Sequence, residues 1–148
     1  MNERKEFERY LKAIGITSKV FLDRIEIIYD MCCEMCPEEI EDVFVTNYIN
    51  SQKQVEYENL WFFSPSYCLE AKQFLQKYDL DITPIKERIR YWTITVDNYD
   101  FKQATADSKL SLQFELVQGV EAFFKSEGKN CGFLKNIIDK YVKPNLVA

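Results

Sequence analysis

The stretch 120-VEAFFKSEGKNCGFLKNIIDKYVKPNL-146 contains the pattern of one strand followed by the pattern of one helix. Apolar and polar side chains alternate over 120–125, with Phe123 as the exception, which indicates a strand with one buried face. Asn130 can cap a helix, because its side-chain oxygen can accept a hydrogen bond from the first turn. The apolar residues that follow share one helical face: Phe133, Leu134, Ile137, Ile138 and Tyr141. A helix over Gly132–Val142 with one apolar face needs a sheet or the mouth of a barrel to cover, so the stretch predicts an α+β domain.

The composition predicts one folded domain and limits its partners. A chain of 148 residues can bury a core without disulfides, and 47 % hydrophobic with 15 % aromatic residues argues against disorder. The formal net charge is -5 and the isoelectric point is about 4.9. Because phosphate backbones and anionic lipids repel an acidic chain, we expect no nucleic-acid partner and no stable membrane association. The composition leaves a homo-oligomer open.

The sequence contains five cysteines and no histidine. Without histidine the chain lacks the commonest general base and metal ligand, and it cannot form a Ser-His or Cys-His nucleophile pair. An odd number of cysteines is not typical of a disulfide framework. The first residues lack the apolar region of a secretion signal, and no stretch approaches about 18 apolar residues. We therefore expect a reduced, soluble, cytoplasmic protein without a cofactor.

Residues 1–37 are predicted to form a pair of helices that packs on the following domain. The apolar residues of the first helix recur at helical spacing: Phe7, Tyr10, Leu11 and Ile14. Gly15 suits the C-terminal end of that helix. The second helix carries a comparable stripe and ends at Pro37: Phe21, Ile25, Ile28 and Cys32. The short connection favours an antiparallel pair.

Residues 38–148 carry the period-two pattern of short strands. We expect strands at residues 42–49, 60–63, 67–74, 80–84, 91–96, 110–116 and 120–125. The segment Pro65–Tyr78 has two interpretations. Ser64 and Pro65 also suit the start of a helix, but a strand is favoured because the neighbouring strands need a partner.

Seven short strands followed by an amphipathic helix, over residues 42–146, resemble the pleckstrin-homology-like superfold. This resemblance implies a seven-stranded antiparallel barrel, partly open, that a C-terminal helix closes at one end. Phe133 or Tyr141 would take the place of the tryptophan that many members carry in that helix. Phosphoinositide-binding members carry a basic cluster around the first hairpin loop, whereas the loop Asn50–Gln54 offers only Lys53. Many other members bind peptides or proteins, so the resemblance implies a protein or peptide partner.

Aromatic residues are concentrated in two of the expected strands, at Trp61, Phe62, Phe63, Tyr91 and Trp92. Neighbours in a strand point to opposite faces, so one of Trp61 and Phe62 and one of Tyr91 and Trp92 should face outward or into a second layer. An exposed aromatic patch would suit a protein partner. Alternatively, the N-terminal helices cover this face.

Basic residues recur at period two at Lys86, Arg88 and Arg90. On a strand they would form a cationic stripe able to hold a phosphate or a carboxylate. The alternative is a solvated outer face with Glu87 beside them. The candidate ligand-binding residues are therefore Trp61, Tyr91, Trp92, Lys86, Arg88 and Arg90.

The cysteine group Cys32, Cys33 and Cys36 resembles a metal site at first. Cys32 and Cys36 share a helical face, but Cys33 points away and no histidine can complete a zinc site, so we expect buried hydrophobic side chains and no metal. Cys131 opens the C-terminal helix, where the helix dipole would lower its thiol pKa. Cys131 and Cys68 are the first candidates for a reactive thiol.

Acidic residues offer two further alternatives. The group Glu38–Asp42 contains four acids, but their spacing does not match a calcium-binding loop, and a solvated connector is favoured. Glu70 could pair with Asp81 or Asp100 as acid and base, which only a tertiary structure can decide.

Taken together, the residues favour a non-catalytic binding or regulatory module. A sheet edge can accept an extended peptide by strand addition, and an outward aromatic side chain can then anchor it. The alternative is a sensor of a small molecule or a lipid headgroup that uses a barrel cavity or the basic stripe. An enzyme is the third and least favoured interpretation, because it would have to work without histidine.

Overall fold

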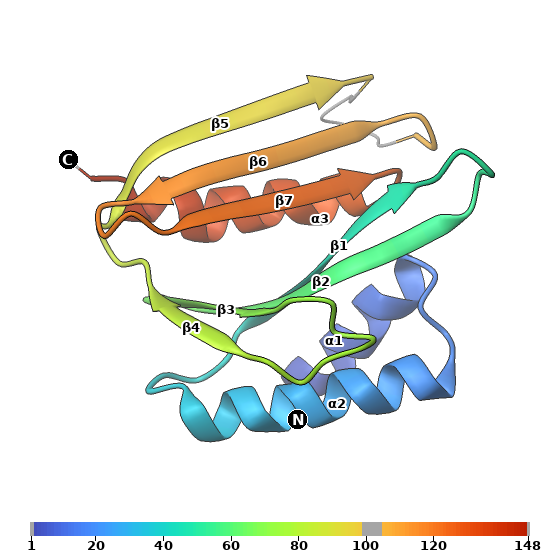
Figure 1. Ribbon diagram of the computed structural model, residues 1–148, viewed down its shortest axis with the longest axis horizontal. Coiled ribbons are helices and arrows are strands. Elements are labelled where there is room, and N and C mark those ends of the chain that lie inside the picture. The colour runs from blue at the N-terminus through green and yellow to red at the C-terminus, as the bar shows by residue number, and fades with distance from the viewer. Residues whose placement is uncertain (1, 99–104, 148) are drawn as a thin grey trace. The chain divides into compact units, whose positions relative to one another are not determined.

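The computed structural model describes residues 2–98 and 105–147, with side chains from residue 5 onward. These residues form three α-helices and seven strands in two antiparallel sheets (Figure 1). The α+β class and the seven expected strands are confirmed. The elements are α1 Asn2–Ala13, α2 Lys19–Met35, β1 Asp42–Ile49, β2 Val55–Ser64, β3 Tyr67–Ala71, β4 Asp81–Pro84, β5 Ile89–Asp97, β6 Lys109–Leu116, β7 Glu121–Glu127 and α3 Asn130–Ile137.

The chain divides into two compact units. The first contains the residues up to Val45 together with Glu58–Thr83, and the second contains Thr46–Tyr57 together with the residues from Pro84 onward. The helices α1 and α2 therefore belong to the same unit as β3, and α3 belongs to the same unit as β5, β6 and β7.

In the first unit α1 and α2 pack on the face of the sheet that carries Phe62. The ring of Phe7 meets the ring of Tyr29 edge-on at 5.4 Å, and both rings contact the ring of Phe62. The hydroxyl of Tyr10 accepts a hydrogen bond of 2.8 Å from the backbone N–H of Val45. Gly15 follows α1 with a φ of 97°, the left-handed conformation expected of a glycine at a helix C-terminus.

The ambiguous segment Pro65–Tyr78 begins as a strand, which confirms the favoured interpretation. In the β2–β3 hairpin Phe62 lies opposite Leu69, and Ser64 lies opposite Tyr67. Glu38 stabilises the turn, because its carboxylate accepts hydrogen bonds from the Ser64 hydroxyl, the Ser66 hydroxyl and the Ser66 N–H. The strand ends at Ala71, earlier than expected, and a turn follows it.

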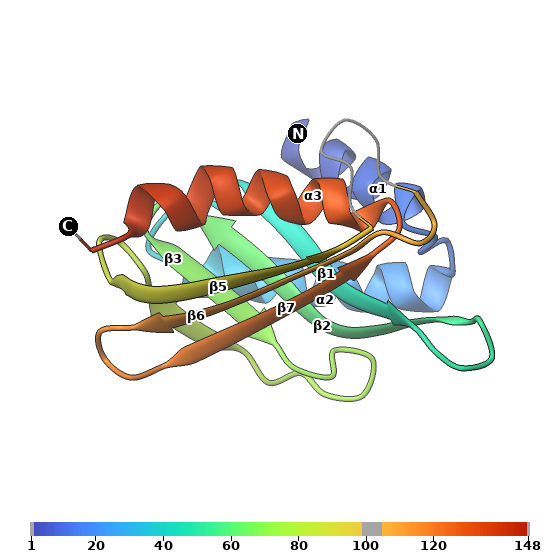
Figure 2. The same cartoon turned by 90° about the horizontal axis from the view of Figure 1, so that it is seen from above.

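In the second unit α3 lies along one face of the sheet β5-β6-β7 (Figure 2). The side chains of β6 and β7 that point to this face are buried: Leu110, Leu112, Phe114, Leu116, Ala122, Phe124 and Ser126. The helix continues beyond Ile137 as a π-helical turn over Ile138–Val142 and a 3-10 turn over Lys143–Asn145. The expected C-terminal helix is thus confirmed, with a longer and less regular end.

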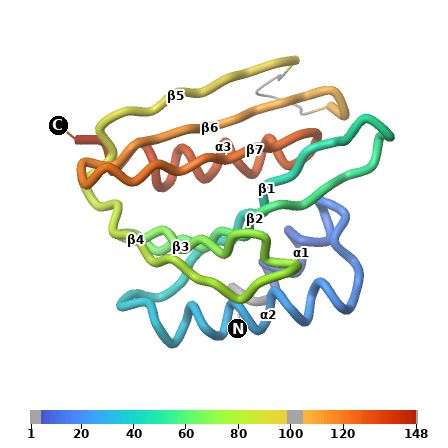
Figure 3. The backbone as a smooth tube through the Cα atoms, in the orientation of Figure 1, coloured from blue at the N-terminus to red at the C-terminus, as the bar shows by residue number. Residues whose placement is uncertain are grey.

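The expected single barrel of seven strands is wrong for the described residues. Four strands form one sheet in the order β1-β2-β3-β4, and three form another in the order β5-β6-β7. Between the sheets Pro84 ends β4, and a turn in which the Arg88 N–H donates to the Ile85 carbonyl separates it from β5 (Figure 3). Because proline has no N–H to donate to a ladder, the strand cannot run on through this position.

Side chains replace a strand ladder between the end of β1 and β7. The Asn47 amide donates to the Glu127 carbonyl over 3.4 Å, and its oxygen accepts from the Glu127 N–H over 3.1 Å. The same oxygen accepts from the Asn130 amide over 2.9 Å, and the Ile49 N–H donates to the Glu127 carboxylate over 2.7 Å. Asn47 thus bonds to Glu127 much as a neighbouring peptide group would.

Candidate functional site

The strand β5 is an edge strand with hydrogen-bonding capacity on its outer side. Its ladder partner is β6, with Trp92 opposite Phe114 and Val96 opposite Leu110. In an antiparallel edge strand, about half of the backbone N–H and C=O groups point away from the sheet. Among the residues that the structure describes, strand pairing on the outer side of β5 occurs only at Ile89. We call the part of β5 beyond Ile89 the β5 edge.

Both faces of the β5 edge expose apolar side chains. Trp92 and Val96 point to the face that α3 covers on β6 and β7, yet they are 37 % and 46 % exposed. Tyr91 points to the opposite face and is 65 % exposed. The expectation that at least one of Tyr91 and Trp92 faces outward is confirmed, and both are accessible.

The C-terminal segment already adds to the start of β5. Leu146 forms a parallel bridge with Ile89, and the Val147 N–H donates to the Ile89 carbonyl over 2.8 Å. This contact covers only the first residue of the strand. At Ile89 the outer side of β5 thus pairs with another segment of the chain.

The basic residues flank the β5 edge but do not form a stripe along a strand. Lys86 and Arg88 lie in the turn before β5, and Arg90 lies on the strand. Arg90 makes an ion pair of 3.0 Å with Glu115 of β6, which raises the pKa of its guanidinium group, and its guanidinium carbon lies 5.4 Å from the centre of the Tyr91 ring. The expected period-two stripe is wrong because the turn over Ile85–Arg88 interrupts the extended backbone.

Trp61 is not available as a surface anchor. It is only 2 % exposed, and its ring stacks at 6.4 Å on the ring of Phe63. Its neighbour Phe62 is fully buried and contacts Phe7 and Tyr29 of the helices. Because neighbours in a strand point to opposite faces, both faces of β2 are covered at this point.

The three buried cysteines, Cys32, Cys68 and Cys131, do not offer a reactive thiol. Burial raises the pKa of Cys32 and of Cys68 to about 12 each. Burial also raises the pKa of Cys131, although its thiol donates a hydrogen bond to the Ser126 carbonyl. The expected lowering of the Cys131 pKa at the helix N-terminus is therefore wrong, because burial of the thiol is the largest influence on it. All five cysteines are free, and no group of three metal-ligating side chains occurs in the described part of the chain.

One carboxyl group titrates close to neutral pH. Burial raises the pKa of Glu70 on β3 to about 7; Lys72 opposes this shift, and Asp81 adds to it. Glu70 accepts a hydrogen bond of 3.3 Å from the Asn59 amide. The structure thus places Glu70 near Asp81, one of the two acids proposed as its partner, while Asp100 lies outside the described residues.

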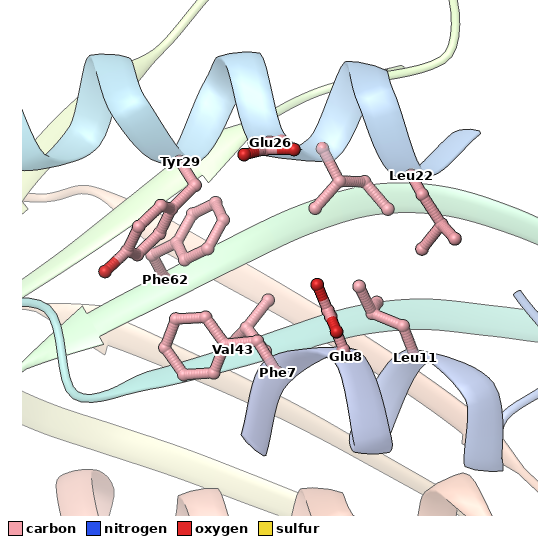
Figure 4. Close-up of a pocket in the computed structure, with 9 residues that line it drawn as sticks. Phe7, Glu8, Leu11, Leu22, Glu26, Tyr29, Val43 and Phe62 are labelled. Carbon is pink, nitrogen blue, oxygen red and sulfur yellow. The ribbon is translucent and has the colours of Figure 1, made fainter. Parts of the chain in front are cut away.

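Sequence reasoning missed a pocket between α1, α2 and the strands β1 and β2 (Figure 4). Its lining comes from both helices and both strands: Phe7, Glu8, Leu11, Leu22, Ile25, Glu26, Tyr29, Val43 and Phe62. The sequence signal is weak, because Glu8 and Glu26 each follow a residue of a buried helical stripe. Only the packing of the two helices shows that these acids border the same pocket.

Comparison with known proteins gives no relative from which a site can be transferred. No protein-family model, curated protein or solved structure matches the chain. No helix in the described ranges is both long enough and apolar enough to span a membrane.

Proposed function

We propose that this protein is a non-catalytic binding module that recognises an extended peptide segment of a partner protein at the β5 edge. We further propose that it belongs to the pleckstrin-homology-like superfold. The order of four strands, three strands and a C-terminal helix supports this second proposal.

One observation carries the peptide-binding proposal. On β5, apolar side chains are exposed on the same strand that has backbone groups directed away from the sheet, with Trp92 and Val96 on one face and Tyr91 on the other. Strand addition needs both features, because main-chain hydrogen bonds supply affinity and side-chain contacts supply specificity. The bridge from Leu146 to Ile89 supports the proposal, since a segment of chain already pairs on this side.

The charged residues around β5 indicate which charge the partner peptide should carry. Lys86 and Arg88 are exposed beside the start of β5, whereas its last residue is Asp97. A complementary segment carries apolar residues at alternate positions, so that they meet Trp92 and Val96, and an acidic residue near Lys86 and Arg88. The protein as a whole is acidic, so these basic residues make the β5 edge a distinctive place for an acidic peptide.

Selection from a displayed library of random linear peptides tests this function. We expect the selected peptides to alternate apolar and polar residues and to carry an acid at one end. A synthetic peptide of the selected sequence should shift the backbone amide resonances of β5 and slow hydrogen exchange on that strand. Peptides that shift resonances elsewhere, or a library that yields no specific binder, would contradict the proposal.

A pair of matched variants sharpens the test. The double variant Trp92→Ala with Val96→Ala should weaken peptide binding by about tenfold or more, because truncating an anchor at an interface has effects of this size. The control Phe123→Ala removes an exposed aromatic ring from the same sheet, on β7, and should leave the affinity unchanged. Equal losses in both variants would contradict a site at the β5 edge. Concentration-dependent shifts on β5 without peptide would instead identify a second copy of the chain as the occupant.

A further inference from the structure

We propose that a groove between α2 and β4 binds an amphipathic helix of a partner protein, with basic residues beside the apolar face of that helix. The groove has a volume of about 410 Å³, and all of its lining residues belong to the first compact unit. We call it the α2–β4 groove. The last turns of α2 form one wall, and the segment that leads into β4 forms the other (Figure 1). It is a different surface from the β5 edge and takes a different partner.

Apolar side chains that remain accessible line the α2–β4 groove. Met31 and Met35 come from α2, and the others come from the segment 78–82: Tyr78, Leu80 and Ile82. Met35 is 65 % exposed and Tyr78 is 47 % exposed. Apolar side chains that gather on a surface are typical of a docking site, and flexible methionine side chains adapt to an apolar partner. The groove therefore has the lining of a protein-binding surface.

Arg24 of α2 holds the second wall of the groove in place. Its guanidinium carbon lies 4.0 Å from the centre of the Tyr78 ring, and the group donates a hydrogen bond of 3.0 Å to the Tyr78 hydroxyl. The same guanidinium group donates to the Phe74 carbonyl. These contacts fix Tyr78 against α2 before a partner binds. A wall that is already ordered lowers the entropy cost of binding.

The charged residues among the described lining residues are both acidic. Glu34 lies on α2, Asp79 follows Tyr78, and both are exposed. Neither carboxylate makes an ion pair within the described part of the chain. The whole chain carries a formal net charge of -5. Because opposite charges attract and like charges repel, the residues of the partner that flank its apolar face should be Lys or Arg.

The shape of the apolar surface favours a helix as the partner. Ile27, Met31 and Met35 recur every four residues, so they form a row of about 12 Å along α2, and Ile27 is also exposed. A second helix can pack along such a row with its own apolar residues three and four positions apart. A strand added to β4 would pair over a short length, because β4 has only four residues and ends at Pro84.

Selection from a library of helical surfaces tests the proposal on the full chain. The library is a displayed three-helix scaffold in which the outer face of one helix is randomised. We expect the selected faces to combine an apolar row with flanking Lys or Arg. The purified scaffold should then give saturable amide shifts over residues 27–35 and 78–82. Acidic selected faces, shifts elsewhere or the lack of a specific binder would overturn the proposal. Concentration-dependent shifts at these residues without scaffold would overturn it in favour of a second copy of the chain.

A cation placed in the groove tests its location. Met35→Lys should weaken binding of the selected scaffold at least tenfold, because it removes an apolar contact and repels the basic partner. The control Val117→Lys makes the same charge change at an exposed apolar position in the β6–β7 turn and should leave the affinity within about twofold. Both positions are exposed, so both variants should fold. Equal weakening by the two lysines would rule out the α2–β4 groove as the site.

A charge-matched pair of double variants tests the two lining carboxylates. Glu34→Gln with Asp79→Asn should weaken binding of the scaffold about three- to tenfold. The control Glu121→Gln with Asp107→Asn removes two exposed acids of the second compact unit and should have little effect. The same loss in both would reject the role of these carboxylates.

The variant of the β5 edge separates this inference from the proposed function. Trp92→Ala with Val96→Ala should leave binding of the helical scaffold unchanged while it weakens binding of the extended peptide. A matching loss of scaffold affinity would place the helix at the β5 edge and overturn the α2–β4 groove. Either proposal can therefore fail without the other.

Discussion

Two strands of this protein carry neighbouring aromatic residues that have opposite environments. In β2, Trp61 and Phe62 are both buried, whereas in β5, Tyr91 and Trp92 are both exposed. β2 has a strand on each side, and helices α1 and α2 contact Phe62. β5 is an edge strand, and α3 packs against β6 and β7. A pair of neighbouring aromatic residues therefore does not by itself indicate core or surface. The position of its strand in the sheet determines whether the pair is buried.

The largest expected effect comes from the buried side of this comparison. Phe62→Ala should lower the free energy of unfolding by about 3–5 kcal/mol, because a fully buried ring in contact with Phe7 and Tyr29 leaves a cavity. Urea denaturation of the two proteins measures the difference. A loss below about 1 kcal/mol, the range of exposed positions, would break the contrast between the two strands.

The polar contact between β1 and β7 should give the next largest effect. Asn47→Ala removes the hydrogen bonds that Asn47 makes with both backbone groups of Glu127 and with the Asn130 amide, at a cost of about 1–3 kcal/mol. Asn136→Ala, at an exposed position, serves as the control and should stay within about 0.5 kcal/mol. Similar unfolding midpoints for the two variants would show that the contact adds nothing to stability.

The next prediction concerns the pH dependence of stability. It compares the carboxyl group of Glu70, in the β2–β3 hairpin, with that of Glu115, in the sheet β5-β6-β7. The pKa of Glu70 is about 7 in the folded protein, against 4.5 for an ordinary glutamate side chain, so the folded state binds more protons than the unfolded state between these values. The contribution of Glu70 to stability is therefore present at low pH and is lost as pH rises from about 4.5 to about 7. Denaturation across this range should show the decline, and Glu70→Gln should remove it. Glu115→Gln, on β6, should leave the decline in place.

The smallest effect is expected on the exposed side. Tyr91→Ala should change the free energy of unfolding by no more than about 0.5 kcal/mol, because 65 % of this residue is exposed. Urea denaturation of Tyr91→Ala and of Phe62→Ala under the same conditions measures the free energy of unfolding for the exposed and the buried aromatic position together. A loss of several kcal/mol would mean that Tyr91 belongs to the core and would remove it from the proposed binding surface.

Local patterns in the sequence predicted the helices and strands well. How distant strands pair could not be predicted from these patterns, and this limited the prediction of the fold. The alternation of Leu110, Leu112 and Phe114 specifies β6 within a few residues, since a strand pattern depends on near neighbours. Closure into one barrel depends on which distant strands meet. The pairing of β1 to β4 in one sheet and of β5 to β7 in another joins residues far apart in the chain, and no period in the sequence reports it.

The candidate sites were harder to predict because burial is a property of the whole fold. The position of Cys131 at the start of a helix suggested a lowered thiol pKa. The surrounding residues bury the thiol, and this burial raises its pKa. Trp61 was expected to serve as a surface anchor, and its place in a central strand buries it. The pocket between α1 and α2 was missed because its lining residues come together only after the two helices pack on β1 and β2.

The bridge between Leu146 and Ile89 has a practical consequence for measuring weak ligands of β5. It holds the chain next to the start of the strand, so a peptide fused after Ala148 would be tethered close to the β5 edge. A short flexible linker of this kind gives an effective concentration on the order of millimolar. Such fusions would allow a set of weakly binding sequences to be ranked within single molecules, without adding free peptide at saturating amounts.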